Sequence, residues 1–143
     1  MAVTNKNSEA QQKYKDSQWK ELNEKVQNLI VANDLFGLKN VYVEMAEFVK
    51  SEGKDNAYLL ELAYKSGLKL QKEELKRYKK FGTCKGVEII TVTNSPGNNS
   101  CEACAQFNGK VFTISEALLK NPLPVKNCCH KWGCRCVYAP VVD

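Results

Sequence analysis

The chain has 143 residues, a net charge of +5 and an apolar fraction of 43%. These values exclude a disordered tail and allow one sizeable hydrophobic core. No apolar run approaches the roughly 18 residues that a bilayer span needs, and the first residues lack the apolar segment of a secretory signal. We therefore expect a soluble cytoplasmic protein with no membrane partner.

Apolar residues at helical spacing predict that residues 1–82 form a set of antiparallel helices. We expect the first helix to begin at a capping box made by Ser8 and Gln11. One unit resembling a tetratricopeptide repeat is visible in this region, but such arrays need about three units, so ordinary antiparallel packing is expected. The predicted helix breaks lie at residues 32–35, at Gly53 and at Gly67, and the last helix is a short one over residues 68–80.

After residue 82 the sequence is rich in β-branched and turn-forming residues, which predicts a second, β-rich domain over residues 83–143. Strands are expected at residues 86–93, 109–114 and 134–142. Ser115 is expected to cap a short helix that ends before two prolines. The predicted fold class is therefore α+β, with N-terminal antiparallel helices followed by a small β-rich domain.

Cysteine dominates that second domain, because six of the seven cysteines lie between Cys101 and Cys136. An odd count without an export signal argues against a disulfide framework. The CxxC segment offers two thiolates at the spacing of a tetrahedral zinc site, and the segment NCCHKWGCRC offers the other two. We predict a structural Zn²⁺ ion that staples this domain through Cys101, Cys104, Cys128 and Cys134.

The choice among the later ligands rests on geometry. Two adjacent cysteines can hardly serve one tetrahedral ion, and in a strand Cys134 and Cys136 would share a face, so that one can ligate while the other is buried. An iron–sulfur cluster is a less favoured occupant. The alternative ligands are Cys129, His130 and Cys136.

The segments CEACAQFNGKVFTI, PLPV and CCHKWGCRC together resemble the C-terminal module of Mu-F-like phage head morphogenesis proteins, which are minor head components near the portal. The resemblance implies an assembly role and association with a virion. It covers about residues 100–138 and departs from the family pattern in three ways: Phe-Asn replaces Leu-Asp before the glycine, an extra residue separates His130 from Cys134, and the pair Cys128-Cys129 is additional. The matching residues are Cys101, Cys104, Gly109, Lys110, Phe112, Pro122, Pro124, His130, Cys134, Arg135 and Cys136.

Several kinds of catalytic site are excluded because the chain has a single histidine, His130. It cannot supply both the base and the metal ligand of an HNH nuclease, and no histidine precedes Cys101 as a zinc deaminase requires. No nucleophile elbow and no phosphate-binding glycine loop is present. Thiol–disulfide exchange at the CxxC is the remaining enzymatic alternative.

A row of lysines on the last predicted helix provides a possible contact for nucleic acid. Their spacing places them on one helix face, where they could neutralise phosphates. The simpler interpretation is a solvated face on which Glu73 supports Arg77. The four residues, which we call the lysine stripe, are Lys69, Lys72, Lys76 and Lys80.

The sequence as a whole predicts a non-enzymatic zinc-binding module for interaction or assembly, with a protein or a nucleic acid as partner. A CxxC redox protein is the alternative.

Overall fold

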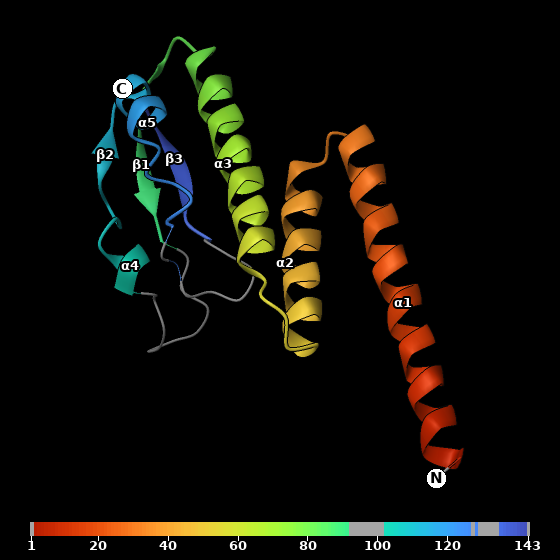
Figure 1. Ribbon diagram of the computed structural model, residues 1–143. Coiled ribbons are helices and arrows are strands. Elements are labelled where there is room, and N and C mark those ends of the chain that lie inside the picture. Colours follow the sequence, from red (N-terminus) through yellow and green to blue (C-terminus); the bar gives the residue numbers. More distant parts are fainter. Residues whose placement is uncertain (1, 92–101, 127, 129–134, 143) are drawn as a thin grey trace.

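A computed structural model describes residues 2–91, 102–126, 128 and 135–142, and side chains from residue 8 onward (Figure 1). The described part contains helices followed by a small antiparallel sheet, which confirms the α+β class. None of its helices combines the length and the apolar character needed to cross a membrane. The elements are α1 (Ala2–Val31), α2 (Leu35–Ser51), α3 (Ala57–Lys79), β1 (Cys84–Ile90), α4 (Glu102–Ala105), β2 (Val111–Phe112), α5 (Ile114–Lys120) and β3 (Val137–Val142).

The first three helices lie side by side, with α2 between α1 and α3 (Figure 1). Asp34 caps α2 because its carboxylate accepts a hydrogen bond from the Gly37 N–H at 2.9 Å. Trp19 of α1 stacks on Phe48 of α2, with ring centroids 5.5 Å apart. The buried residues of this layer form the helical core, which consists of Val26, Leu38, Val41, Met45, Ala46, Val49 and Leu59.

Two predicted helix boundaries are wrong. The helix α1 begins at Ala2, so Ser8 lies inside it and does not cap it. Gly67 does not end a helix either, because α3 is continuous across it. Gly67 is instead a point of close packing, since a Cβ atom there would lie 3.3 Å from Pro124 and 3.4 Å from the Lys39 side chain.

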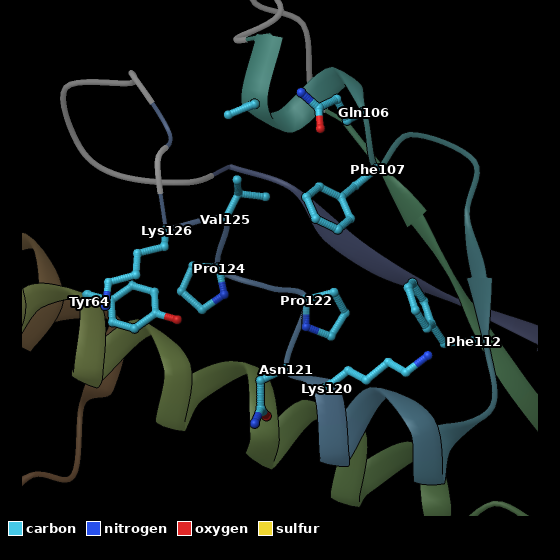
Figure 2. Close-up of a pocket in the computed structure, with 11 residues that line it drawn as sticks. Tyr64, Gln106, Phe107, Phe112, Lys120, Asn121, Pro122, Pro124, Val125 and Lys126 are labelled. Atoms are coloured by element: carbon cyan, nitrogen blue, oxygen red, sulfur yellow. The ribbon is translucent and has the colours of Figure 1, made fainter.

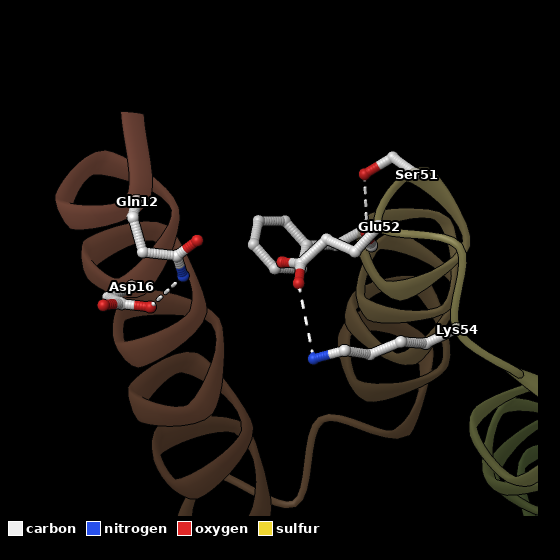
Figure 3. Close-up of polar contacts among 6 residues, drawn as sticks. Gln12, Asp16, Ser51, Glu52 and Lys54 are labelled. Atoms are coloured by element: carbon white, nitrogen blue, oxygen red, sulfur yellow. Dashed lines mark hydrogen bonds and ion pairs between the residues drawn. The ribbon is translucent and has the colours of Figure 1, made fainter. Parts of the chain in front are cut away.

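Exposed polar contacts in the helical layer are local (Figure 3). Gln12 donates to Asp16 one turn later at 2.9 Å, and the Ser51 hydroxyl donates to the Phe48 carbonyl at 2.6 Å. Lys54 pairs with Glu52 at 3.4 Å. None of these three contacts joins two helices.

The sheet has the strand order β2-β1-β3, and both pairings are antiparallel. The three predicted strands are present with shifted ends: β1 begins at Cys84, β2 is only two residues long, and β3 begins at Val137. Gly86 lies beside an irregularity in the β1–β3 register, and a Cβ atom on it would meet the Phe112 carbonyl oxygen at 2.6 Å. A glycine is therefore needed at position 86, where the backbone of β2 approaches β1 most closely.

The short helix α5 is capped by Thr113 and not by the predicted Ser115. Thr113 and Glu116 form a capping box, in which the Thr113 hydroxyl accepts from the Glu116 N–H at 3.1 Å. The helix ends at Lys120, and its C-cap residue Asn121 adopts a left-handed conformation with a φ of 49°.

One side of the sheet packs with α3, α4 and α5 around a second cluster. We call this cluster the sheet core; it consists of Leu75, Val87, Ile89, Cys104, Ile114, Ala117, Leu123, Val125, Cys136 and Tyr138. Leu75 belongs to α3, so that helix contributes Leu59 to the helical core and Leu75 to the sheet core. The division of the chain at residues 82 and 83 stays a prediction, because α3 serves both parts.

Candidate functional site

The fold brings together two of the four predicted zinc ligands, although 24 positions separate them in the chain. Cys104 lies in α4, Cys128 follows the proline-rich segment after α5, and their Sγ atoms are 3.4 Å apart. A disulfide would require about 2.05 Å. Two thiolates on one tetrahedral zinc ion lie about 3.8 Å apart, given Zn–S bonds of about 2.3 Å. The pair is therefore not a disulfide: the two sulfurs lie within hydrogen-bond distance, a separation that two ligands of one ion would also have.

The other two predicted ligands, Cys101 and Cys134, lie outside the described residues, as do the alternatives Cys129 and His130. Within residues 2–91, 102–126, 128 and 135–142, no three metal-ligating side chains form a group. A four-ligand site at Cys104 and Cys128 would therefore need donors from residues 92–101 or 127–134. The sulfur chemistry of the pair fits zinc, and the ligand set stays a prediction.

Cys136, the remaining alternative ligand, is turned into the sheet core. It is 2% exposed, and its Sγ atom lies 3.8 Å from the Thr91 hydroxyl. Thr91 in turn donates to the Cys104 carbonyl at 3.2 Å. Arg135 and Val137 are exposed while Cys136 and Tyr138 are buried, which is the alternation expected for an extended segment. This placement suits a packed thiol better than a metal ligand.

Only one of the two CxxC cysteines, Cys104, lies within the described residues, so the structure bears on the redox alternative on that side alone. Cys104 is 0% exposed, but in a CxxC exchange site the first cysteine attacks the substrate, and Cys101 lies outside the described residues, so the redox alternative stays a prediction. Cysteines that take part in exchange are normally accessible and lie in an electropositive setting. Cys84 is half-buried at the start of β1, where its thiol contacts the Gly86 carbonyl at 3.3 Å.

The lysine stripe runs along the C-terminal half of α3 and ends at its C-cap residue, Lys80. Lys69, Lys76 and Lys80 are exposed and Lys72 is half-buried. In the described part of the chain, none of the four forms an ion pair with a carboxylate. Arg77 nearby pairs with Glu74 and not with Glu73 as the sequence suggested.

A pocket that sequence analysis did not find lies between α3 and the sheet half of the molecule (Figure 2). Its volume is about 480 Å³. No sequence pattern could have indicated it, because its walls come from α3, α4, β2, α5 and the segment after α5. Its principal lining residues are Tyr64, Phe107, Phe112, Lys120, Pro122 and Lys126.

Tyr78, at the end of α3, has a perturbed acidity. Burial raises the pKa of its phenol, and a hydrogen bond with Glu74 and the charge of that carboxylate raise it further. Its hydroxyl also lies 3.4 Å from the Tyr138 carbonyl of β3. The neutral hydroxyl of Tyr78 therefore links α3 to β3, because only the protonated phenol can donate a hydrogen bond to that carbonyl.

The chain matches no family model, no curated protein and no solved structure in the comparisons. The similarity to phage head morphogenesis proteins consequently rests on the residues quoted above and stays a prediction.

Proposed function

We propose that the protein is a non-enzymatic interaction or assembly module whose β-rich half is stapled by a structural zinc ion. The observation that carries this proposal is the approach of the Cys104 and Cys128 sulfurs to 3.4 Å from segments far apart in sequence. Cys101 and Cys134 would complete the tetrahedron. A zinc ion with four thiolate ligands has no open coordination position, so it holds the fold and does not activate water.

Two further observations support a stapling role. The segment between the two cysteines contains only short elements, namely α4, β2 and α5. Cys104 nevertheless lies at the centre of the sheet core, beside Thr91 and the sheet itself. A metal bond at that point would tie the segment that contains Cys128 to the sheet core.

Elemental mass analysis of the purified chain tests the proposal directly, and we expect about one zinc per chain. Cys104→Ser and Cys128→Ser should both lose the metal. Cys84→Ser and Cys136→Ser are matched controls that should keep it, because Cys84 lies at the start of β1 and Cys136 faces Thr91. A protein without metal whose Cys101 and Cys104 react readily with thiol reagents would overturn the zinc role and favour the redox alternative.

The lysine stripe supports nucleic acid as one class of partner, because its charges are unpaired within the described residues and lie mostly in solvent. Binding of labelled DNA should weaken steeply with salt, with a slope of about −0.9 per neutralised phosphate in duplex DNA. Replacement of Lys69, Lys72, Lys76 and Lys80 by Gln should reduce that slope.

A control with the same loss of charge comes from four exposed lysines of α1. Their replacement by Gln should leave the salt slope closer to that of the unaltered chain, and an equal loss in both variants would remove the stripe as a specific contact. The control residues are Lys13, Lys15, Lys20 and Lys25.

The resemblance to Mu-F-like proteins supports an origin in phage head assembly, with a protein partner in the virion. The clustered cysteines support a cytoplasmic site of action, because thiolates that bind zinc persist in a reducing compartment.

A further inference from the structure

We infer that the pocket between α3 and the sheet half binds an acidic peptide segment with an apolar side chain at its centre. The inference depends on the interaction role proposed above but on neither the zinc ion nor the lysine stripe. It rests on the charge, the lining and the ring geometry of the pocket.

The charge of the pocket has one sign. Lys120 and Lys126 line it, and the Nζ atom of Lys110, outside the lining, is 5.0 Å from the centre of the Phe107 ring, which belongs to it. No aspartate or glutamate belongs to the described lining. Several ammonium groups around one concave surface favour an anionic ligand, and carboxylates are its commonest source in a protein partner.

The walls between these charges are apolar. Pro122, Pro124 and Val125 come from the segment after α5, and Phe107 and Phe112 close the opposite side (Figure 2). Pro124 and Val125 are buried and Phe112 is half-buried, so this surface belongs to the rigid packing of the molecule. The volume of about 480 Å³ lies within the range of sites that take small ligands or single side chains with their backbone.

The placement of the ammonium groups favours a peptide over a nucleic acid. Nucleobases bind to such surfaces by stacking on free aromatic faces. Here Lys126 Nζ lies over the Tyr64 ring at 5.4 Å, and Lys110 Nζ lies over the Phe107 ring. Two of the three aromatic rings of the pocket thus already have a lysine ammonium group over one face. An aliphatic side chain of a peptide could still pack against the ring edges and the lysine methylene groups, while the ammonium groups would pair with its carboxylates.

A labelled short peptide with a pair of glutamates on either side of one leucine is the probe, titrated into the full-length chain by fluorescence anisotropy. Lys120→Gln with Lys126→Gln should weaken binding about fivefold, as expected for the loss of two exposed ion pairs. Lys69→Gln with Lys72→Gln removes the same charge from two residues of α3 outside the pocket lining and should change the affinity less than about twofold.

Changes in the peptide separate the two kinds of contact. A peptide with glutamine in place of glutamate should lose most of its affinity, and one with serine in place of leucine should lose part of it. Methyl signals of Ala103 and Val125 should shift on binding, because both residues line the pocket.

Three results would overturn the inference: equal weakening by the two lysine pairs, unchanged affinity of the glutamine peptide, or tighter pocket-dependent binding of a single-stranded oligonucleotide. Thermal unfolding of Lys120→Gln with Lys126→Gln should match that of the unaltered chain, which excludes misfolding as the cause of a loss. The titration is made at a measured zinc content, so a failure of the zinc proposal and a failure of peptide binding are seen separately.

Discussion

The two halves of the molecule are held together in different ways. The helical half has long, regular elements, but most of its core is shallow, with Val26 and Leu38 at 7% and 9% exposure. The sheet half has very short elements around a deeper core, in which Val87 and Ile89 are 0% exposed. The helical half thus has the more regular backbone hydrogen bonding, and the sheet half has the more deeply buried side chains. The helical half should open gradually from α1, whereas the sheet half depends on a few central contacts.

If the zinc proposal is right, metal removal should produce the largest difference in stability between the two halves. Chelation should lower the unfolding free energy of the sheet half by several kcal/mol, because structural zinc contributes directly to folding. Amide hydrogen exchange should then speed up in β1 and β3 while α2 stays protected. Equal loss of protection in α2, or no change in the strands, would contradict a staple confined to the sheet half.

The stabilities of the two cores can be compared by replacing one leucine with alanine in each core. Leu75→Ala in the sheet core should cost about 3–4 kcal/mol, because the side chain is 1% exposed and its removal leaves a cavity in the core. Leu38→Ala in the helical core should cost about 2 kcal/mol, since Leu38 keeps 9% of its surface exposed and therefore loses less buried area than Leu75. Urea unfolding measures both, and equal costs would show that depth of burial does not separate the two halves.

Close backbone packing in the sheet half gives a smaller effect. Gly86→Ala should destabilise the chain by about 1–3 kcal/mol, because the added Cβ would collide with the Phe112 carbonyl and force β2 away from β1. Gly82→Ala is the control, since nothing lies within 4 Å of its added Cβ. Thermal unfolding of the two variants should differ clearly, and equal midpoints would mean that β2 moves aside without cost.

The smallest expected effect is on the pH dependence of stability. The pKa of Tyr78 is raised in the folded chain, so above its unfolded value of about 10 the unfolded state binds fewer protons than the folded state. Stability from this residue is therefore complete below about pH 10 and is lost as the pH rises through the folded pKa. Tyr78→Phe should show a shallower decline in alkaline urea titrations, and Tyr14→Phe, at an exposed position of α1, should follow the unaltered chain.

Local pattern predicted the order of the elements well. The β-branched run after Gly86 became β1, and the helical spacing of Val41, Met45 and Val49 became the buried face of α2. Gly67 was misinterpreted because a glycine that allows close packing looks the same in sequence as one that ends a helix. Its role depends on Pro124, which approaches it only in the folded chain.

The candidate site was predicted in part. Spacing placed Cys104 and Cys128 in one group, and the fold brings their sulfurs together. The capping box of α5 was also legible, because Thr113 and Glu116 have the required spacing, although Ser115 was chosen instead. The pocket was beyond prediction, since Tyr64 and Phe107 share no local pattern and meet only through the packing of α3 against the sheet half.

The continuity of α3 has a practical consequence for dividing the protein. With 23 residues it is about 34 Å long, enough to run past both cores. A gene fragment that starts at residue 83 would lack Leu75 and Tyr78 and leave the inner face of the sheet in water. A fragment that stops at residue 82 would expose Leu75 to solvent, and we expect it to self-associate through this apolar surface. A fragment of either half should therefore include all of α3. Proteolytic cleavage within α3 should leave neither half folded on its own.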